Sequence, residues 1–192
     1  MDESFLEATE IIDWKHPEVL LMAKKLASGR RTDIEIAKTC FEFVRDNIKH
    51  IRDHNIQEVS LKASEVLEYG SGPCYSKSHL LAAVLRANSI PAGICYQRLS
   101  RDDNGPPYVL HALNAVYLSD MGWYRIDARG NNENVNAQFT PPVEQLAFTV
   151  RFEGEINFPD ILAVPHPVVV ESLKNSENTP MEPVIVVDSA SV

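Results

Sequence analysis

The segment 70–88 has the sequence GSGPCYSKSHLLAAVLRAN, which predicts a long helix that begins at a cysteine. This helix is the most informative feature for the fold. Gly70 ends the preceding element, and Gly72-Pro73 opens a helix that is predicted to run from Cys74 to about Asn88. Backbone N–H groups at the start of a helix are unpaired and favour negative charge. A thiol at this position is therefore expected to ionise more easily than a thiol in open chain.

The spacing of the same segment also gives the thiol a direction. Residue 74 shares one helical stripe with residues 78, 81 and 85, so the thiol is expected to point toward the core. The apolar face of this helix comprises Leu80, Leu81, Val84 and Leu85.

The rest of the first half is also predicted to be helical. Pro17 suits the first position of a helix over about 17–28, which Gly29 follows. Thr32 and Glu35 have the spacing of a capping box. The helix that they open has its apolar residues three or four apart, at Ile34, Ala37, Phe41, Val44 and Ile48. A short helix is expected over 64–69.

The second half is predicted to form strands at 94–99, 109–118 and 123–129. The middle strand is apolar at both parities, which is typical of a central strand that is buried on both faces. Residues 119–122 join it to the third strand as a hairpin. Helices followed by an antiparallel meander predict an α+β fold, with the N-terminal helices packed on an antiparallel β-sheet.

A reactive thiol needs a base, and His111 is the only histidine in a predicted strand, with Asp127 on the next strand. Nucleophile, base and orienting carboxylate would then lie on a helix start and two neighbouring strands. A simple four-residue turn at 119–122 pairs residues whose numbers sum to 241, which puts His111 and Asp127 on opposite faces of the sheet. The triad therefore predicts a three- or five-residue turn, or a bulge, between Leu118 and Trp123.

These stretches resemble the transglutaminase-like superfamily over about residues 38–130. The similar stretches are ASEVLEYGSGPC at 63–74, which resembles the AxEVLxxGxGxC approach to the nucleophile, LLAAVLRA at 80–87 with IPA at 90–92, His111-Ala112, and WYRID at 123–127. The resemblance is to small, single-domain members of bacterial type, with a core related to papain-like cysteine proteases and the nucleophile at a helix N-terminus. Gly72-Pro73 and Ala128-Arg129 depart from the common pattern, so the resemblance gives no substrate.

Carried onto this chain, the resemblance implies Cys74 as nucleophile, His111 as base and Asp127 as the residue that orients the imidazole. The chemistry is acyl transfer on an amide bond through a thioester. The Cys74 N–H is the first candidate donor to the oxyanion, and Gln57 is a candidate for the second. The loop 101–107 is expected to flank the substrate groove, and Arg129 with the asparagine-rich loop after it is expected to form the other wall.

Three functions remain open. The first is a cysteine peptidase or amidase that uses water, which the chain length favours over a cross-linking acyltransferase. The second is a catalytically silent domain of the same fold that binds a peptide or a partner protein. The third is a structural domain with a redox-sensitive thiol.

Composition limits the setting and the partners. The 192 residues are expected to form one domain over 1–170 and an extended tail over 171–192, which is rich in Ser, Asn, Glu and Pro. Acidic residues exceed basic ones by 27 − 18 = 9, which argues against nucleic acid and anionic membranes as partners.

The cysteines and histidines bear on location and cofactors. Three scattered cysteines and a start without a secretory pattern favour a cytoplasmic protein with free thiols. His50 and His54 lack a third ligand at a characteristic spacing, so neither a metal nor any other cofactor is expected. A peptide or protein amide is the expected substrate, and the sequence does not indicate an oligomeric state.

Overall fold

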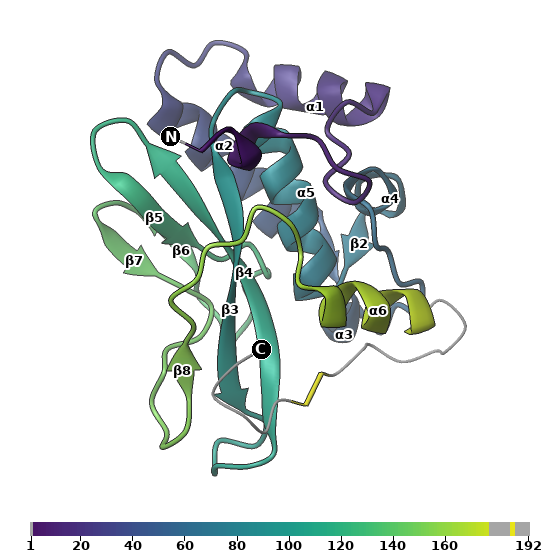
Figure 1. Cartoon of the computed structure of the whole chain (residues 1–192), viewed down its shortest axis with the longest axis vertical. Helices are drawn as coiled ribbons and strands as arrows, with labels where there is room; N and C mark the ends of the chain where they lie inside the picture. Colours follow the sequence, from purple (N-terminus) through teal and green to yellow (C-terminus); the bar gives the residue numbers. More distant parts are fainter. Residues whose placement is uncertain (1, 177–184, 187–192) are drawn as a thin grey trace.

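The computed structural model describes residues 2–176 and 185–186 of the chain (Figure 1). The helices are the 3₁₀ helix η1 (Glu3–Leu6) and the α-helices α1 (Pro17–Ala27), α2 (Asp33–Asn47), α3 (Ile51–His54), α4 (Ala63–Tyr69), α5 (Cys74–Arg86) and α6 (Pro167–Ser176). The strands are β1 (Lys49–His50), β2 (Ser71–Gly72), β3 (Ala92–Ser100), β4 (Tyr108–Leu118), β5 (Gly122–Ile126), β6 (Gln138–Thr140), β7 (Val143–Gln145) and β8 (Ile156–Asn157).

The main sheet has the strand order β5-β4-β3-β8, and its neighbouring strands are antiparallel. β4 lies inside this sheet and is buried over most of its length, as its apolar residues at both parities predict. Two smaller sheets pair β1 with β2 in parallel and β6 with β7 in antiparallel orientation. Mixed helices packed on an antiparallel sheet confirm the predicted α+β fold.

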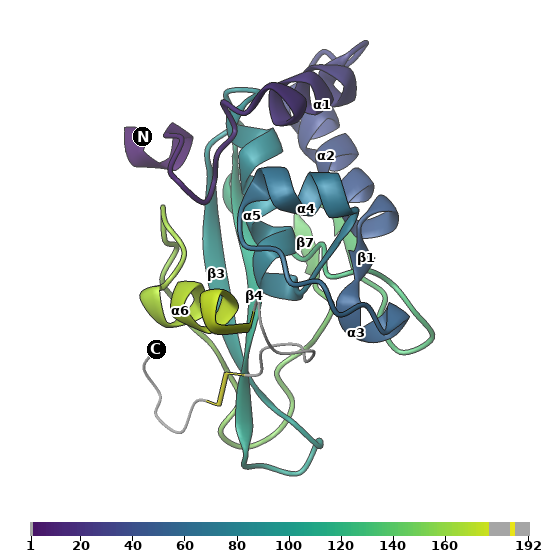
Figure 2. The ribbon, with the colours of Figure 1, turned by 90° about the vertical axis from the view of Figure 1, so that its right-hand side faces the viewer.

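Helix α5 is the centre of the molecule. It packs on β3 and β4, and α1, α2 and α4 pack against its other sides, so that the helices form a layer beside the sheet (Figure 2). All 13 of its residues are buried, including Lys77, His79 and Arg86. The prediction of a single apolar face was therefore too narrow, because this helix is covered both by the sheet and by other helices.

The helix ends follow the sequence signals. Pro17 occupies the first turn of α1, and Thr32 caps α2 with both hydrogen bonds of the capping box. Gly70 ends α4 with a φ of 63°, a left-handed conformation that glycine adopts without strain.

The hairpin between β4 and β5 has one of the predicted turn lengths. Tyr117 pairs with Trp123 and Leu118 with Gly122, which leaves a three-residue turn and paired numbers that sum to the even value 240. β5 ends at Ile126 rather than at residue 129, so Asp127 lies just beyond the strand. The even sum keeps Asp127 on the same face of the sheet as the strand positions 111 and 113.

The C-terminal part differs from the expected extended tail. Residues 167–176 form α6, which buries Val169 and Leu173, so 171–176 are helical and packed. Ile185 is also buried, and its carbonyl accepts a hydrogen bond from the Leu110 N–H at 2.9 Å. The remainder of the expected tail, 177–184 and 187–192, lies outside the described residues. Among the described helices, none is both long and apolar enough to span a membrane.

Candidate active site

Cys74 is the first residue of α5, and its side chain is directed inward. The residue is only 7% exposed, as the helical stripe predicted. Pro73 precedes it in an extended conformation and caps the helix without a side-chain hydrogen bond. The N–H groups of the first turn therefore have no side-chain cap at Pro73.

The approach to Cys74 depends on a close contact at Gly72. The parallel pair β1–β2 places Gly72 beside His50. A Cβ atom at Gly72 would lie 2.6 Å from the Ser76 hydroxyl and 2.9 Å from the Ser60 hydroxyl, distances that real Cβ atoms do not show. A side chain here would have to displace both hydroxyls, which favours the glycine two residues before the thiol.

Two hydrogen bonds fix α5 relative to β4. The Tyr75 hydroxyl donates to the Leu110 carbonyl at 2.7 Å, next to the strand position of His111. The Asn114 side chain donates to the Ser78 carbonyl at 3.0 Å, one turn along the helix. Because both bonds are buried, they hold the start of the helix at a fixed place against the strand.

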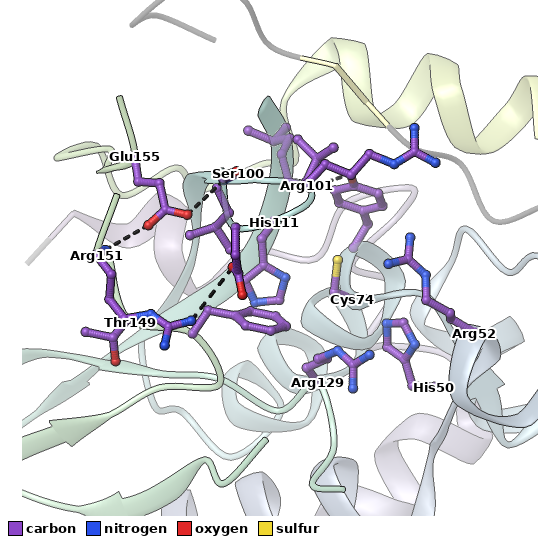
Figure 3. A pocket seen from close by; sticks show the side chains of 16 residues that line it. His50, Arg52, Cys74, Ser100, Arg101, His111, Arg129, Thr149, Arg151 and Glu155 are labelled. Carbon is purple, nitrogen blue, oxygen red and sulfur yellow. Dashed lines mark hydrogen bonds and ion pairs between the residues drawn. The ribbon is translucent and has the colours of Figure 1, made fainter. Parts of the chain in front are cut away.

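His111 and Asp127 are in direct contact. The Nε2 atom of His111 lies 2.8 Å from Oδ2 of Asp127, and both side chains are buried. Since Nε2 is engaged with the carboxylate, Nδ1 is the nitrogen left for a second partner. The Cys74 side chain lies beside the ring and helps to raise the pKa of His111. Figure 3 shows the thiol and the imidazole facing each other.

The surroundings favour the charged form of His111. Burial by itself lowers the pKa of the ring, but the charges of Asp127 and Cys74 and the hydrogen bonds with both outweigh it. The pKa of His111 is raised from 6.5 to about 10. A positively charged imidazolium next to a thiol stabilises the thiolate form, which is the form that acts as a nucleophile.

The Asp127 carboxylate is held by the backbone as well. The N–H groups of Arg129 and Ala147 each donate to it at 3.1 Å. The next residue, Phe148, meets the His111 ring edge to face, with 4.9 Å between the ring centroids. These contacts fix the orientation of the imidazole, and the part played by 147 and 148 was missed in the sequence because no motif marks this loop.

A pocket of about 190 Å³ opens onto the thiol. The side chains labelled in Figure 3 line it, and they are His50, Arg52, Cys74, Ser100, Arg101, His111, Arg129, Thr149, Arg151 and Glu155. Arg101 and Asp103 come from the loop that was expected to flank the groove, and Arg129 from the opposite expected wall.

Gln57 does not line this pocket. It is exposed in the segment between α3 and α4, after the chain turns away at Asn55 in a left-handed conformation. The polar side chain beside the thiol is instead His50, whose pKa is lowered to about 2 by burial and by the nearby charge of Arg129. His50 is therefore neutral near neutral pH.

The other cysteines lie in different surroundings. Cys40 and Cys95 are free thiols like Cys74, but burial raises the pKa of each to about 12. They are buried core residues, as the sequence indicated. Among the described residues, no group of three His, Cys, Asp or Glu side chains is placed to hold a metal ion.

Comparison with known proteins adds the family and the fold. The profile of the Transglutaminase-like superfamily matches residues 21–128. A solved structure of a proposed cysteine protease from Cytophaga hutchinsonii is similar with a TM-score of 0.52 and 21% identity, over 65% of this chain and 40% of that chain. No curated protein sequence matches this chain.

Two further solved structures are similar at lower scores. A proposed protease from Parabacteroides distasonis has a TM-score of 0.46 and 14% identity, over 72% of this chain and 26% of that one. The periplasmic domain of TgpA from Pseudomonas aeruginosa has a TM-score of 0.45 and 19% identity, over 65% and 45% of the two chains. This chain therefore spans less than half the length of each of these three structures.

Proposed function

The chain belongs to the transglutaminase-like superfamily, and on that premise we propose that it is a thiol-dependent enzyme that hydrolyses amide bonds through a thioester on Cys74. The observation that carries the proposal is the buried 2.8 Å contact between His111 and Asp127, with the Cys74 side chain beside the same ring. In this proposal Cys74 is the nucleophile, His111 the acid and base, and Asp127 orients the imidazole.

In the first half of the reaction the Cys74 thiolate attacks the amide carbonyl carbon, and a bond forms between sulfur and carbon. The carbonyl oxygen becomes an oxyanion, which the Cys74 N–H at the start of α5 can bind. When the C–N bond breaks, the protonated His111 gives its Nδ1 proton to the leaving amine. A thioester and a neutral imidazole remain.

In the second half a water molecule loses a proton to Nδ1 of His111 and attacks the thioester carbon. The C–S bond breaks, a carboxylic acid leaves, and the thiolate and imidazolium are restored. Asp127 stabilises the imidazolium in both halves without itself taking up the proton. We propose water as the acceptor because Cys74 is only 7% exposed, and a water molecule needs less room at the thioester than a second, amine-bearing protein.

The test is the rate of alkylation of each cysteine by iodoacetamide between pH 5 and 9, followed by mass spectrometry. Cys74 should react at least about tenfold faster than Cys40 and Cys95 at pH 6.5, since their thiols stay protonated and buried. The imidazolium of His111, which supports this reaction, keeps its proton up to a pH of about 10.

The variant His111→Ala should lose this advantage by roughly tenfold at pH 6.5. His16→Ala is the matched control, because His16 is exposed and lies outside the pocket. If Cys74 in the wild type reacts no faster than the other two cysteines, the enzyme proposal fails and the silent, peptide-binding domain takes its place.

A second measurement separates hydrolysis from cross-linking. A peptide mixture is incubated with the protein in ¹⁸O-labelled water that contains a primary amine, with Cys74→Ala as the blank. Hydrolysis places ¹⁸O in the new carboxyl groups, and amine transfer places the amine at the same carbon. Amine transfer as the main outcome would contradict water as the acceptor but would leave the thiol nucleophile in place.

A further inference from the structure

The pocket around Cys74 carries a charge opposite to that of the whole chain. The chain has ten arginines and 27 acidic residues, with a net charge of −9. Among the side chains that the structure describes, four arginines and two acids line the pocket. The arginines are Arg52, Arg101, Arg129 and Arg151, and the acids are Asp103 and Glu155.

The acids of this region are already engaged. Glu155 accepts backbone hydrogen bonds from Ser100, Arg151 and Phe152 at 2.7–3.0 Å. Asp103 lies 3.8 Å from the Arg151 guanidinium in an exposed ion pair. Both carboxylates keep their negative charge, but four guanidinium groups line the pocket against these two acids, so the pocket keeps an excess of positive charge.

The arginines differ in how firmly they are held. Arg129 is buried and makes a bidentate ion pair with Asp53, with N–O distances of 2.7 and 2.8 Å. This ion pair holds Arg129 in the wall of the pocket. Arg52 on α3 and Arg101 after β3 are exposed. No acidic side chain among residues 2–176 and 185–186 forms an ion pair with Arg101. In Figure 3 both exposed arginines lie on the side of Cys74 away from His111.

We infer that the substrate carries an anionic group beside the amide carbonyl, and that Arg52 and Arg101 bind this group while Cys74 attacks. The inference rests on the proposed function and adds a substrate class to it. Guanidinium groups suit a carboxylate because they offer parallel N–H donors to its two oxygens. An acidic residue or a free carboxyl end next to the scissile amide has this chemistry.

The test compares iodoacetate with iodoacetamide, two reagents of similar size that differ in charge. Each reagent alkylates the Cys74 thiolate with loss of iodide. The rate with iodoacetate divided by the rate with iodoacetamide is measured at Cys74 in the full chain at pH 7. In Arg52→Gln and Arg101→Gln the ratio should fall by roughly threefold each, the effect of removing one charge at solvated distances. Raising the salt to about 0.5 M should lower the wild-type ratio as well.

Arg31→Gln is the matched control, because Arg31 is exposed between α1 and α2, outside the pocket, and the ratio should not change. His111 is present in every variant, so its own charge contributes equally and cancels. An unchanged ratio in both pocket variants, with iodoacetamide still fast at Cys74, overturns the anionic substrate and leaves the thiol enzyme standing. Slow alkylation of wild-type Cys74 by both reagents overturns the proposed function and this inference together.

Discussion

Two buried basic side chains, His111 and Lys77, respond to their surroundings in opposite ways. Burial lowers the pKa of both. At His111 the charges of Asp127 and Cys74 outweigh burial, and the pKa is raised to about 10. At Lys77 burial and the charge of Arg129 prevail, and the pKa is lowered to about 7, although its ammonium donates to the Ile48 carbonyl. The balance between burial and nearby charges therefore decides the direction of each pKa shift.

Folding stability should record this difference. The raised pKa of His111 adds to the free energy of unfolding; this contribution is fully present below pH 6.5 and is lost as the pH rises to about 10. The lowered pKa of Lys77 reduces the free energy of unfolding below pH 7, and this reduction disappears toward pH 10.5. The two trends oppose each other in wild type. In Lys77→Met only the His111 trend remains, so the free energy of unfolding should fall from pH 7 to 10 relative to wild type.

The same measurement on His111→Phe gives the opposite expectation, a free energy of unfolding that rises over that range relative to wild type. Urea denaturation at pH 6, 7, 8, 9 and 10 provides both series. Parallel pH profiles for all three proteins would show that neither pKa is shifted in the way described.

The position of His50 in the active site could not be predicted from the sequence. It reaches the site because β1 pairs with β2, which puts His50 beside Gly72. A strand of two residues has no periodic pattern, and the partner is 22 positions away, so no local signal marks it. Gln57 is a candidate donor to the oxyanion only because of its amide group, and the turn at Asn55 places it at the surface.

Among the elements, α2 begins at the capping box that its sequence predicted. The Thr32 hydroxyl accepts the Glu35 N–H at 3.2 Å, and the Glu35 carboxylate accepts the Thr32 N–H at 3.2 Å. Thr32→Ala should lower the free energy of unfolding by about 1 kcal/mol in urea at pH 7. Thr32→Ser keeps the hydroxyl and should stay close to wild type. Equal losses in both variants would assign the effect to the methyl group rather than to the cap.

The β4–β5 hairpin was predictable and α6 was not, for physical reasons. In a strand the side-chain period is two, so requiring His111 and Asp127 on one face fixed the parity of the turn. The helix α6 lies in a segment whose composition resembles a tail, and burial of Val169 and Leu173 against the rest of the molecule stabilises it. Tertiary contacts of this kind leave little trace in local sequence.

At the scale of the whole molecule, Arg86 joins three distant segments. Its guanidinium donates to the carbonyls of Ala92, Glu7 and Ala163 at 2.7–3.0 Å while 2% exposed. Burial lowers its pKa to about 10. The Arg86 guanidinium is thus one hydrogen-bond donor shared by the N-terminal segment, the start of β3 and the loop before α6. Removing this side chain removes that donor from all three segments.

Arg86→Met should therefore lower the free energy of unfolding by about 3 kcal/mol, since three carbonyls are left without a charged donor. Hydrogen exchange should quicken around residues 5–12 and 161–163 in this variant. Arg125→Gln is the comparison, because the Arg125–Glu144 ion pair is partly exposed and should contribute less than about 1 kcal/mol. A loss at Arg86 no larger than that at Arg125 would contradict the joining role.

The burial of α5 on every side has a consequence for how this sequence can change over time. A helix at a protein surface has an outer row of positions where substitutions are nearly neutral, and drift accumulates there. Cys74–Arg86 has no such row, since all 13 residues are covered. Any replacement that the core accepts must also preserve the place of the first residue, so selection for folding and selection for the thiol act on the same thirteen positions.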